Sequence, residues 1–336
     1  MRSAETMQEK SPVSEETTVR RAAVLEAPQK VSIKEFELPE PGEGEVRIKL
    51  EGSGVCASNI PVWEGRDWFD YPVTPGEPGH EGWGTIDAVG AGVKDLKEGD
   101  RVTALTYKAY ATHDIAKEDT VVKLPESLSG KAFPGEPLGC AMNIFNRSDI
   151  QKGQKVAIVG SGFLGSLLVQ LVKSAGAEVI AVSRRQFSLD TAKEAGADHL
   201  VQMDDHYKII EEVKELTGGN FCERVIECTG KEWPLNLSIE LTGTRGKLIV
   251  AGFHQDGMRS LNVQMLNWRG IDMISAHERD PQQYIKGIKT AIDAVEQGKM
   301  DPFPLFTHKF SLEEMGQAYE HLTERPDGFI KALIIN

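Results

Sequence analysis

The feature that most constrains the fold is a glycine pattern between two apolar segments. Residues 155–159 (KVAIV) are typical of a buried strand, because the four residues after Lys155 are all apolar. Residues 163–177 (FLGSLLVQLVKSAGA) repeat apolar side chains with a helical period, and the helix is expected to end at Gly176. The loop between strand and helix is Gly160-Ser161-Gly162-Phe163-Leu164-Gly165. This succession predicts the first unit of a parallel α/β sheet that binds a dinucleotide.

Each glycine of this loop has an expected physical role. Gly160 makes the tight turn, and Gly162 lets the backbone approach a pyrophosphate. Gly165 lets the helix pack closely on the strand, while the helix N-terminus faces the phosphates. The alternative interpretation is a turn that is merely rich in glycine.

The end of the next strand indicates which dinucleotide is preferred. An NAD-binding chain usually has Asp or Glu about 20 residues after the glycine loop, where the acid binds the ribose hydroxyls. Here the strand at 178–183 (EVIAVS) ends in Ser183, and Arg184 and Arg185 follow it. A hydroxyl and two guanidinium groups suit a 2′-phosphate, so NADP(H) is expected in preference to NAD(H). The alternative is an arginine that only ends the strand in solvent.

The chain divides into segments of different texture. Residues 1–19 are polar without periodicity, which predicts a disordered tail. Residues 20–137 hold short β-rich runs between Gly/Pro turns, as in an antiparallel, partly closed barrel. Residues 138–282 alternate strands and helices, which predicts a doubly wound parallel sheet. Residues 283–336 are mixed, and their last strand is expected to return to the first domain.

Charge and cysteine content exclude several classes of function. The chain has 38 Lys and Arg against 51 Asp and Glu, a net charge of −13 that disfavours nucleic acid and anionic lipid as partners. No apolar run approaches about 20 residues, so no membrane span is expected. The start of the chain has no secretory pattern, and the cysteines are not spaced as a disulfide framework. We therefore expect a cytoplasmic protein.

Three segments carry residue types that bind metal ions. They contain Cys56, Ser58 and Asn59, then His80 and Glu81, then Glu136 and Cys140. Taken singly each is weak, because a buried cysteine is most often a small hydrophobe and a His-Glu pair is most often a surface pair.

Together, ahead of a dinucleotide-binding domain, these segments resemble the medium-chain zinc-dependent alcohol dehydrogenase family, in particular its sorbitol and threonine dehydrogenase branch. The resemblance covers residues 21–336, and its motifs in order are GVCAS, PGHEGWG, EPLG, GSGFLG and ECTG. It implies a catalytic domain built on a GroES-like, partly open β-barrel and a Rossmann cofactor domain with a doubly wound parallel sheet.

The resemblance also implies roles for individual residues. Cys56 and His80 match the first two ligands of one catalytic zinc, and Glu136 matches the third. Glu81 matches an acid that is a ligand in some relatives and a support in others, so either Glu81 or water completes the shell. Ser58 matches the hydroxyl that passes the alcohol proton to solvent, and Cys140 is expected to line the nicotinamide pocket. The remaining cofactor contacts are expected at Cys228, Thr229, Gly252 and Phe253.

The chain departs from the family at several positions. Asn59 stands where an acid usually orients the zinc histidine, and Pro61 where many relatives have an outer relay histidine. His113 is a candidate to replace that relay. The four-cysteine lobe for a structural zinc is missing, so we expect the catalytic zinc alone.

Further residues have two interpretations each. Trp63, Trp68 and Phe69 either wall a substrate cleft or pack in the core. His277, Glu278 and Arg279 either meet substrate or a partner subunit, or lie on a solvated loop. The remaining histidines are expected to be structural or exposed, and they are His199, His206, His308 and His321.

These observations predict a zinc-dependent oxidoreductase that interconverts an alcohol and its carbonyl with NADP(H). The resemblance favours a polyol, sugar-derived or amino-alcohol substrate and a homodimer or homotetramer. Two alternatives stay open: a zinc-free quinone or enoyl reductase of the same fold, and a non-catalytic NADP(H)-binding scaffold.

Overall fold

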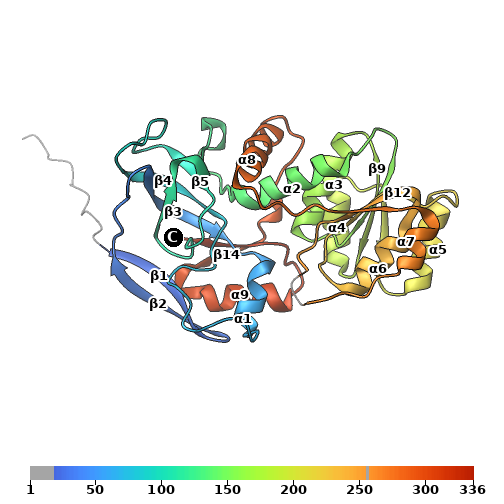
Figure 1. Ribbon diagram of the computed structural model, residues 1–336, viewed down its shortest axis with the longest axis horizontal. Helices are drawn as coiled ribbons and strands as arrows, with labels where there is room; N and C mark the ends of the chain where they lie inside the picture. Colours follow the sequence, from blue (N-terminus) through green and yellow to red (C-terminus); the bar gives the residue numbers. More distant parts are fainter. Residues whose placement is uncertain (1–18, 255–256) are drawn as a thin grey trace, which may run out of the picture.

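The computed structural model describes residues 19–254 and 257–336, which form two lobes (Figure 1). The predicted disordered tail lies outside the described residues except for Val19, the first residue of a strand. No helix within the described part of the chain is long and apolar enough to cross a membrane.

The first lobe is antiparallel β-structure, as predicted. Its strands are β1 (Val19–Ala27), β2 (Lys30–Glu37), β3 (Glu45–Gly54), β4 (Gly82–Val89), β5 (Arg101–Ala104), β6 (His113–Lys117), β7 (Val121–Lys123), β14 (His308–Ser311) and β15 (Ala332–Ile335). The main sheet has the order β14-β15-β3-β4-β5-β7, with β6 also paired to β3. Alternate residues Val46, Ile48 and Leu50 of β3 are buried in the barrel core, which is the period-two pattern of a strand with one apolar face.

The end of the chain returns to this lobe. β15 pairs antiparallel with β3, and β14 pairs parallel with β15. The last strand of the chain therefore lies in the sheet of the first lobe. The lobe also holds short helices, which are η1 (Ala57–Asn59), α1 (Ile60–Glu64), η2 (Glu118–Thr120), η3 (Glu126–Leu128), η4 (Phe303–Leu305), η5 (Leu312–Glu314) and α9 (Met315–Glu324).

The second lobe is a six-stranded parallel sheet of order β10-β9-β8-β11-β12-β13. Its strands are β8 (Lys155–Val159), β9 (Glu178–Ser183), β10 (His199–Gln202), β11 (Cys222–Glu227), β12 (Thr242–Val250) and β13 (Asp272–Ser275). Its helices are α3 (Phe163–Ser174), α4 (Gln186–Glu194), α5 (His206–Leu216), α6 (Glu232–Leu241) and α7 (Val263–Arg269). Strand order reverses between β8 and β11, which is where a doubly wound sheet binds its ligand.

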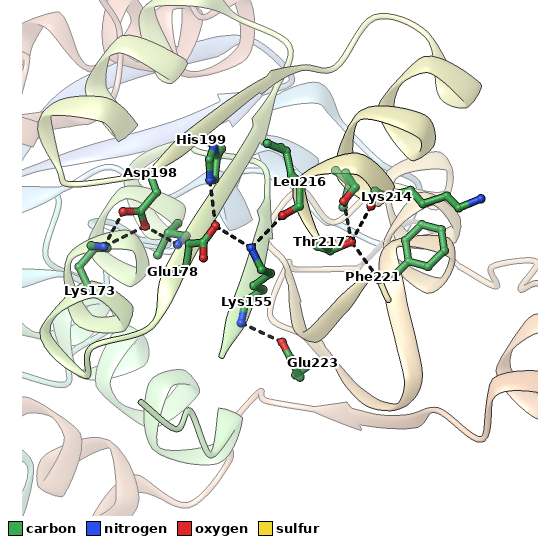
Figure 2. A network of polar contacts seen from close by, with 12 residues as sticks. Lys155, Lys173, Glu178, Asp198, His199, Lys214, Leu216, Thr217, Phe221 and Glu223 are labelled. Carbon is green, nitrogen blue, oxygen red and sulfur yellow. Dashed lines mark hydrogen bonds and ion pairs between the residues drawn. The ribbon is translucent and has the colours of Figure 1, made fainter. Parts of the chain in front are cut away.

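The two edges of this sheet differ in chemistry. Lys155, Glu178 and His199 are the first residues of β8, β9 and β10. They therefore lie at the end of the sheet where the strands begin, opposite the ligand crevice. Figure 2 shows them linked: Lys155 Nζ donates to Glu178 Oε1 at 2.9 Å and to the carbonyl of Leu216 at 2.8 Å, and His199 Nε2 lies 2.9 Å from Glu178 Oε1. This network links the first residues of three neighbouring strands at the end of the sheet opposite the ligand crevice.

Two helices connect the lobes. The sequence placed the domain boundaries after residues 137 and 282, and both positions fall inside a helix, α2 (Gly135–Ser148) and α8 (Pro281–Glu296). The helices pack closely because a Cβ at Gly287 would lie 2.7 Å from the carbonyl oxygen of Gly139. One apolar core joins α2 and α8 to residues of both lobes, so the lobes form a continuous body.

Candidate functional site

Strand pairing brings three metal-binding side chains together. Cys56 follows β3, while His80 and Glu81 immediately precede β4, and the two strands are antiparallel neighbours. The backbone N–H of Gly54 donates to the carbonyl of Glu81 at 3.1 Å, which aligns the two ends. One ligand atom of each of Cys56, His80 and Glu81 lies within 4.8 Å of the others. A thiolate, an imidazole and a carboxylate at this separation suit Zn²⁺.

The histidine is oriented by a backbone carbonyl. His80 Nδ1 lies 2.8 Å from the carbonyl oxygen of Pro78, so Nδ1 carries the proton and Nε2 is left for a metal ion. Asn59 contacts the same carbonyl through Nδ2 at 3.4 Å, and its Oδ1 accepts from the hydroxyl of Tyr110 at 2.6 Å. The amide at the position of the family's acid therefore supports Pro78 rather than bonding the ring itself.

The charges around His80 favour a cation. Burial lowers the pKa of His80, but Cys56, Glu136 and Glu81 outweigh it and raise the value to about 10. Glu136 lies outside the tight group of three, yet its charge acts on His80. Burial raises the pKa of Glu136, and the Cys140 thiol donates to its Oε1 at 3.3 Å. The pocket thus concentrates negative charge that a metal ion can neutralise.

Sequence reasoning missed Lys331, which ties the metal-binding residues to the glycine loop. Lys331 Nζ lies 2.7 Å and 2.6 Å from the two carboxylate oxygens of Glu81, and both side chains are buried. The same Nζ lies 4.9 Å from the ring centroid of Phe163. The available signal was a single lysine inside the otherwise apolar run 329–335, because a charge there needs a buried partner.

The glycine loop has the conformation that its pattern predicts. Gly160 has φ +100°, and a Cβ at Gly165 would lie 2.2 Å from the carbonyl oxygen of Gly160. A Cβ at Gly162 would meet nothing within 4 Å, which leaves open space over the backbone. The N-terminus of α3 has no side-chain cap, and the buried hydroxyl of Ser161 has no partner among the described residues. A pyrophosphate fits this uncapped helix end.

The ends of β11 and β12 complete the crevice. Glu227, which sequence reasoning also missed, is fully buried and accepts hydrogen bonds from the backbone N–H groups of Thr229 and Gly230 and from the Thr229 hydroxyl. His254 Nε2 lies 2.9 Å from its other oxygen. A Cβ at Gly160 would lie 2.6 Å from Thr229 Cγ2, so the predicted residues Cys228 and Thr229 adjoin the glycine loop.

The neighbouring strand end is equally tight. A Cβ at Gly252 would lie 2.3 Å from the backbone nitrogen of Gly230, and one at Gly230 would lie 2.4 Å from the carbonyl oxygen of Phe253. The structure therefore brings the predicted cofactor residues of three strands to one crevice, at the carboxyl ends of β8, β11 and β12.

The predicted 2′-phosphate residues lie at the end of β9. Ser183 is buried, Arg184 is exposed and Arg185 precedes α4. Arg185 Nη1 donates to the carbonyl of Phe329 at 2.7 Å, so this residue bonds to the catalytic lobe.

Other predicted residues lie in different surroundings. Ser58 lies in η1, two residues after Cys56, and Pro61 is the second residue of α1. His113 does not reach the site: its ring contacts Thr112 and Asp87 on the barrel, because β6 directs it there. The proposed relay role of His113 is therefore wrong.

The aromatic residues expected near substrate separate into two groups. Trp63 is buried and stacks on Tyr319 with ring centroids 4.8 Å apart, so it is a core residue. Trp68 is exposed, and Phe69 packs partly against the same core. A further aromatic residue, Tyr284 of α8, was not predicted. Burial raises its pKa, as do the neighbouring Cys140 and Glu136, which places its hydroxyl beside the metal-binding pocket.

The remaining predicted histidines and charges are peripheral. His199 pairs with Glu178 and His206 with Glu240, while His308 and His321 lie with ring centroids 5.5 Å apart. The segment expected to meet substrate or a partner precedes α8, where the backbone N–H groups of Arg279 and Asp280 donate to Glu278. His277 lies 6.2 Å from the ring of Phe253 at the crevice.

Comparison with known proteins agrees with this geometry. Residues 42–141 match the alcohol dehydrogenase GroES-like domain, and residues 164–294 match the zinc-binding dehydrogenase domain. A sorbitol dehydrogenase from Halalkalibacterium halodurans is 28% identical over 86% of this chain and 91% of its own length. A D-arabitol-phosphate dehydrogenase from Enterococcus avium is also 28% identical, over 86% of this chain and 90% of its own length.

Solved structures share the fold. A zinc-binding dehydrogenase from Sinorhizobium meliloti, bound to NADP, superposes with a TM-score of 0.83 at 23% identity over 95% of this chain and all of its own. Galactitol-1-phosphate dehydrogenase from Escherichia coli gives 0.81 at 24% identity, over 94% of this chain and all of its own. The predicted GroES-like barrel and Rossmann sheet are confirmed. This chain belongs to the zinc-dependent medium-chain alcohol dehydrogenase family, as an NAD(P)-dependent oxidoreductase.

Proposed function

We propose that this chain is a zinc-dependent polyol dehydrogenase that prefers NADP(H) and holds one catalytic zinc ion. The observation that carries the proposal is the group of Cys56, His80 and Glu81, with ligand atoms within 4.8 Å of one another. Lys331 connects this group to the dinucleotide loop through Glu81 and Phe163. A metal-binding pocket and a nucleotide crevice that share one side chain suit a reaction between an alcohol and a nicotinamide.

Each residue of the pocket has a task in this reaction. Zn²⁺ held by Cys56 and His80, with Glu136 or Glu81, would supply a Lewis acid for the substrate oxygen. NADP⁺ bound in the crevice would supply the hydride acceptor, so oxidation of the alcohol would yield the carbonyl, NADPH and one proton. Ser58, two residues after Cys56 in η1, would accept that proton and pass it to solvent.

The fixed charges keep the pocket ordered during turnover. Lys331 holds both carboxylate oxygens of Glu81, and the Cys140 thiol donates to Glu136. These contacts restrain Glu81 and Glu136, the two acids that are alternative zinc ligands in this proposal. Cys140 therefore fits a role in lining the pocket beside the nicotinamide rather than as a ligand.

Substrate and cofactor classes follow from different residues. The relatives with similar sequences are named as sorbitol and arabitol-phosphate dehydrogenases, which supports a polyol or sugar-derived substrate. Preference for NADP(H) rests on Ser183, Arg184 and Arg185 at the end of β9, where no acid is available for ribose hydroxyls.

Assembly and location are part of the same proposal. The exposed edge strand β13, beside exposed Trp268, supports a homodimer or a homotetramer built from such dimers. A cytoplasmic location suits a site that depends on the reduced thiolate of Cys56.

Metal content and turnover of the same protein test the proposal. We expect close to one zinc per chain after desalting, and NADP⁺ reduction with a panel of polyols that stops when zinc is chelated and resumes on its return. Turnover without metal would replace the proposal with a zinc-free reductase. Cofactor binding without turnover of any alcohol or ketone would replace it with a scaffold.

A further inference from the structure

The end of α9 in the catalytic lobe lies against the arginines of the cofactor lobe. Arg185, before α4, donates from Nη1 to the carbonyl of Phe329 at 2.7 Å, although the two residues are 144 positions apart. Phe329 follows α9 by five residues, and α9 and α4 belong to different lobes in Figure 1. This hydrogen bond therefore fixes the segment 325–329 beside the end of β9.

That segment carries a third arginine. Arg325 ends α9 with φ +51°, and its Nε lies 3.4 Å from the carbonyl of Leu322. Its charge is close to the other two: desolvation lowers the pKa of Arg185, and Arg325 and Arg184 lower it further. Burial of the guanidinium also lowers the pKa of Arg325, with Arg184 as the next cause, although Arg325 as a whole residue is exposed to solvent, as Arg184 is.

This concentration of positive charge is weakly compensated. Asp327 is the acid that opposes the effect of the arginines on Arg185, and within the described residues none of the three guanidinium groups forms an ion pair. Like charges repel, so three clustered guanidiniums in a chain of net charge −13 are more stable with an anion between them. Their place at the end of the second strand of the sheet is where the adenosine ribose of a dinucleotide lies.

We propose that Arg325 is the third arginine of the 2′-phosphate site, supplied by the catalytic lobe, so that NADP(H) is gripped by both lobes at its adenosine end. The inference rests on the proposed preference for NADP(H) and adds a specificity residue outside the Rossmann domain. NAD(H) has no 2′-phosphate, so it contacts this end of α9 without the ionic bridge. Arg325 then discriminates between the cofactors through the catalytic lobe.

Two arginine variants with matched backbones test the proposal. Arg245 also has a positive φ, +58°. It lies near the start of β12, at the end of the sheet opposite the cofactor crevice. Because both positions are left-handed, Arg325→Gln and Arg245→Gln carry the same backbone cost. Dissociation constants of NADPH, NADH, adenosine 2′,5′-bisphosphate and AMP are measured on the zinc-loaded enzyme.

Arg325→Gln should weaken NADPH and the bisphosphate by about tenfold or more, since it removes a charge-assisted hydrogen bond, and leave NADH and AMP unchanged. Arg245→Gln should change none of the four. Arg325→Lys keeps the charge and should restore part of the lost NADPH affinity. The same variant tests the proposal if Arg325→Gln folds poorly. Equal weakening of NADPH and NADH, or no change in either, would overturn the role of Arg325.

The result is separable from the cofactor proposal itself. If the unaltered enzyme binds NADH as tightly as NADPH, the proposed NADP(H) preference fails. If it prefers NADPH and Arg184→Gln removes that preference while Arg325→Gln does not, only the third arginine is wrong.

Discussion

At the scale of single residues, Lys331 and Glu81 form a buried ion pair 250 positions apart. Both carboxylate oxygens lie within 2.7 Å of Nζ, and neither side chain is exposed by more than 6%. Removing one partner leaves the other charge buried and unpaired. Lys331→Met should therefore lower the free energy of unfolding by about 3 kcal/mol in metal-free protein, measured by urea denaturation.

The loss should be smaller with zinc present, because a cation beside Glu81 compensates the carboxylate. Lys309→Met changes an exposed lysine on the neighbouring strand β14 and should stay within about 0.5 kcal/mol of the unaltered chain. Equal stability of the two variants would show that Lys331 does not neutralise Glu81.

Cys56 is expected to be essential for the metal ion and dispensable for the fold. Cys56→Ser replaces a soft thiolate by a weakly acidic hydroxyl, so zinc per chain should fall from about one to near zero. NADPH should still bind, since the Rossmann sheet is unaltered. Elemental analysis and cofactor titration of the same sample measure both, and retained zinc would show that the ligand set is wrong.

At the scale of elements, two glycines of one loop should behave in opposite ways. A Cβ at Gly165 would lie 2.2 Å from a backbone oxygen, so Gly165→Ala must push α3 away from β8. It should lower stability by about 1–3 kcal/mol. Gly162→Ala meets nothing within 4 Å and should keep the fold while weakening dinucleotide binding, because the methyl group occupies the space over the helix end. Thermal melts and NADPH titrations separate the two effects.

The network of Lys155, Glu178 and His199 in Figure 2 should make the free energy of unfolding depend on pH. A hydrogen bond from Lys155 is the first cause that lowers the pKa of Glu178, so its contribution is present above the unfolded pKa of about 4.3 and is lost as pH falls through the folded value. Glu178→Gln should cost under about 1 kcal/mol at pH 7, since the pair is one-third exposed. The difference from the unaltered chain should shrink as the pH falls below about 4.3, whereas exposed Glu211→Gln should show no such trend in urea titrations.

Local sequence predicted the elements whose pattern is strong and missed those made by tertiary contact. The apolar run of β8, the periodic α3 and the barrel strands were readable because each follows its own period. α2 was not predicted, since Gly135, Pro137 and Gly139 are poor helix formers and its packing on α8 overrides them. For the same reason Lys331, Tyr284 and Glu227 could not be placed: their partners are set by the fold and not by spacing.

At the scale of the whole molecule, the site lies where two lobes meet, and contacts from the end of the chain complete it. Lys331, the residue before β15, pairs with Glu81, and the carbonyl of Phe329 accepts a hydrogen bond from Arg185. The shared core of α2 and α8 fixes the lobes behind these contacts. Metal pocket, dinucleotide loop and arginine cluster are therefore mechanically connected through residues 325–331.

The remaining edge of the parallel sheet predicts how chains assemble. β13 pairs with β12 on one side, and the described residues place no strand on its other side. Met273 on β13 is 41% exposed and Trp268 of α7 is 82% exposed, so this edge presents apolar side chains to solvent. Edge-to-edge pairing of two copies across a two-fold axis, as in the proposed homodimer, would cover it. Met273→Lys should halve the mass measured by light scattering, from an even multiple of 37.0 kDa.

Tyr207→Lys, on α5 near the opposite edge strand β10, is the control. It removes a side chain that is 76% exposed and should leave the mass unchanged. A single-chain mass for the unaltered protein would contradict this assembly, and an unchanged mass for Met273→Lys would move the interface to another surface.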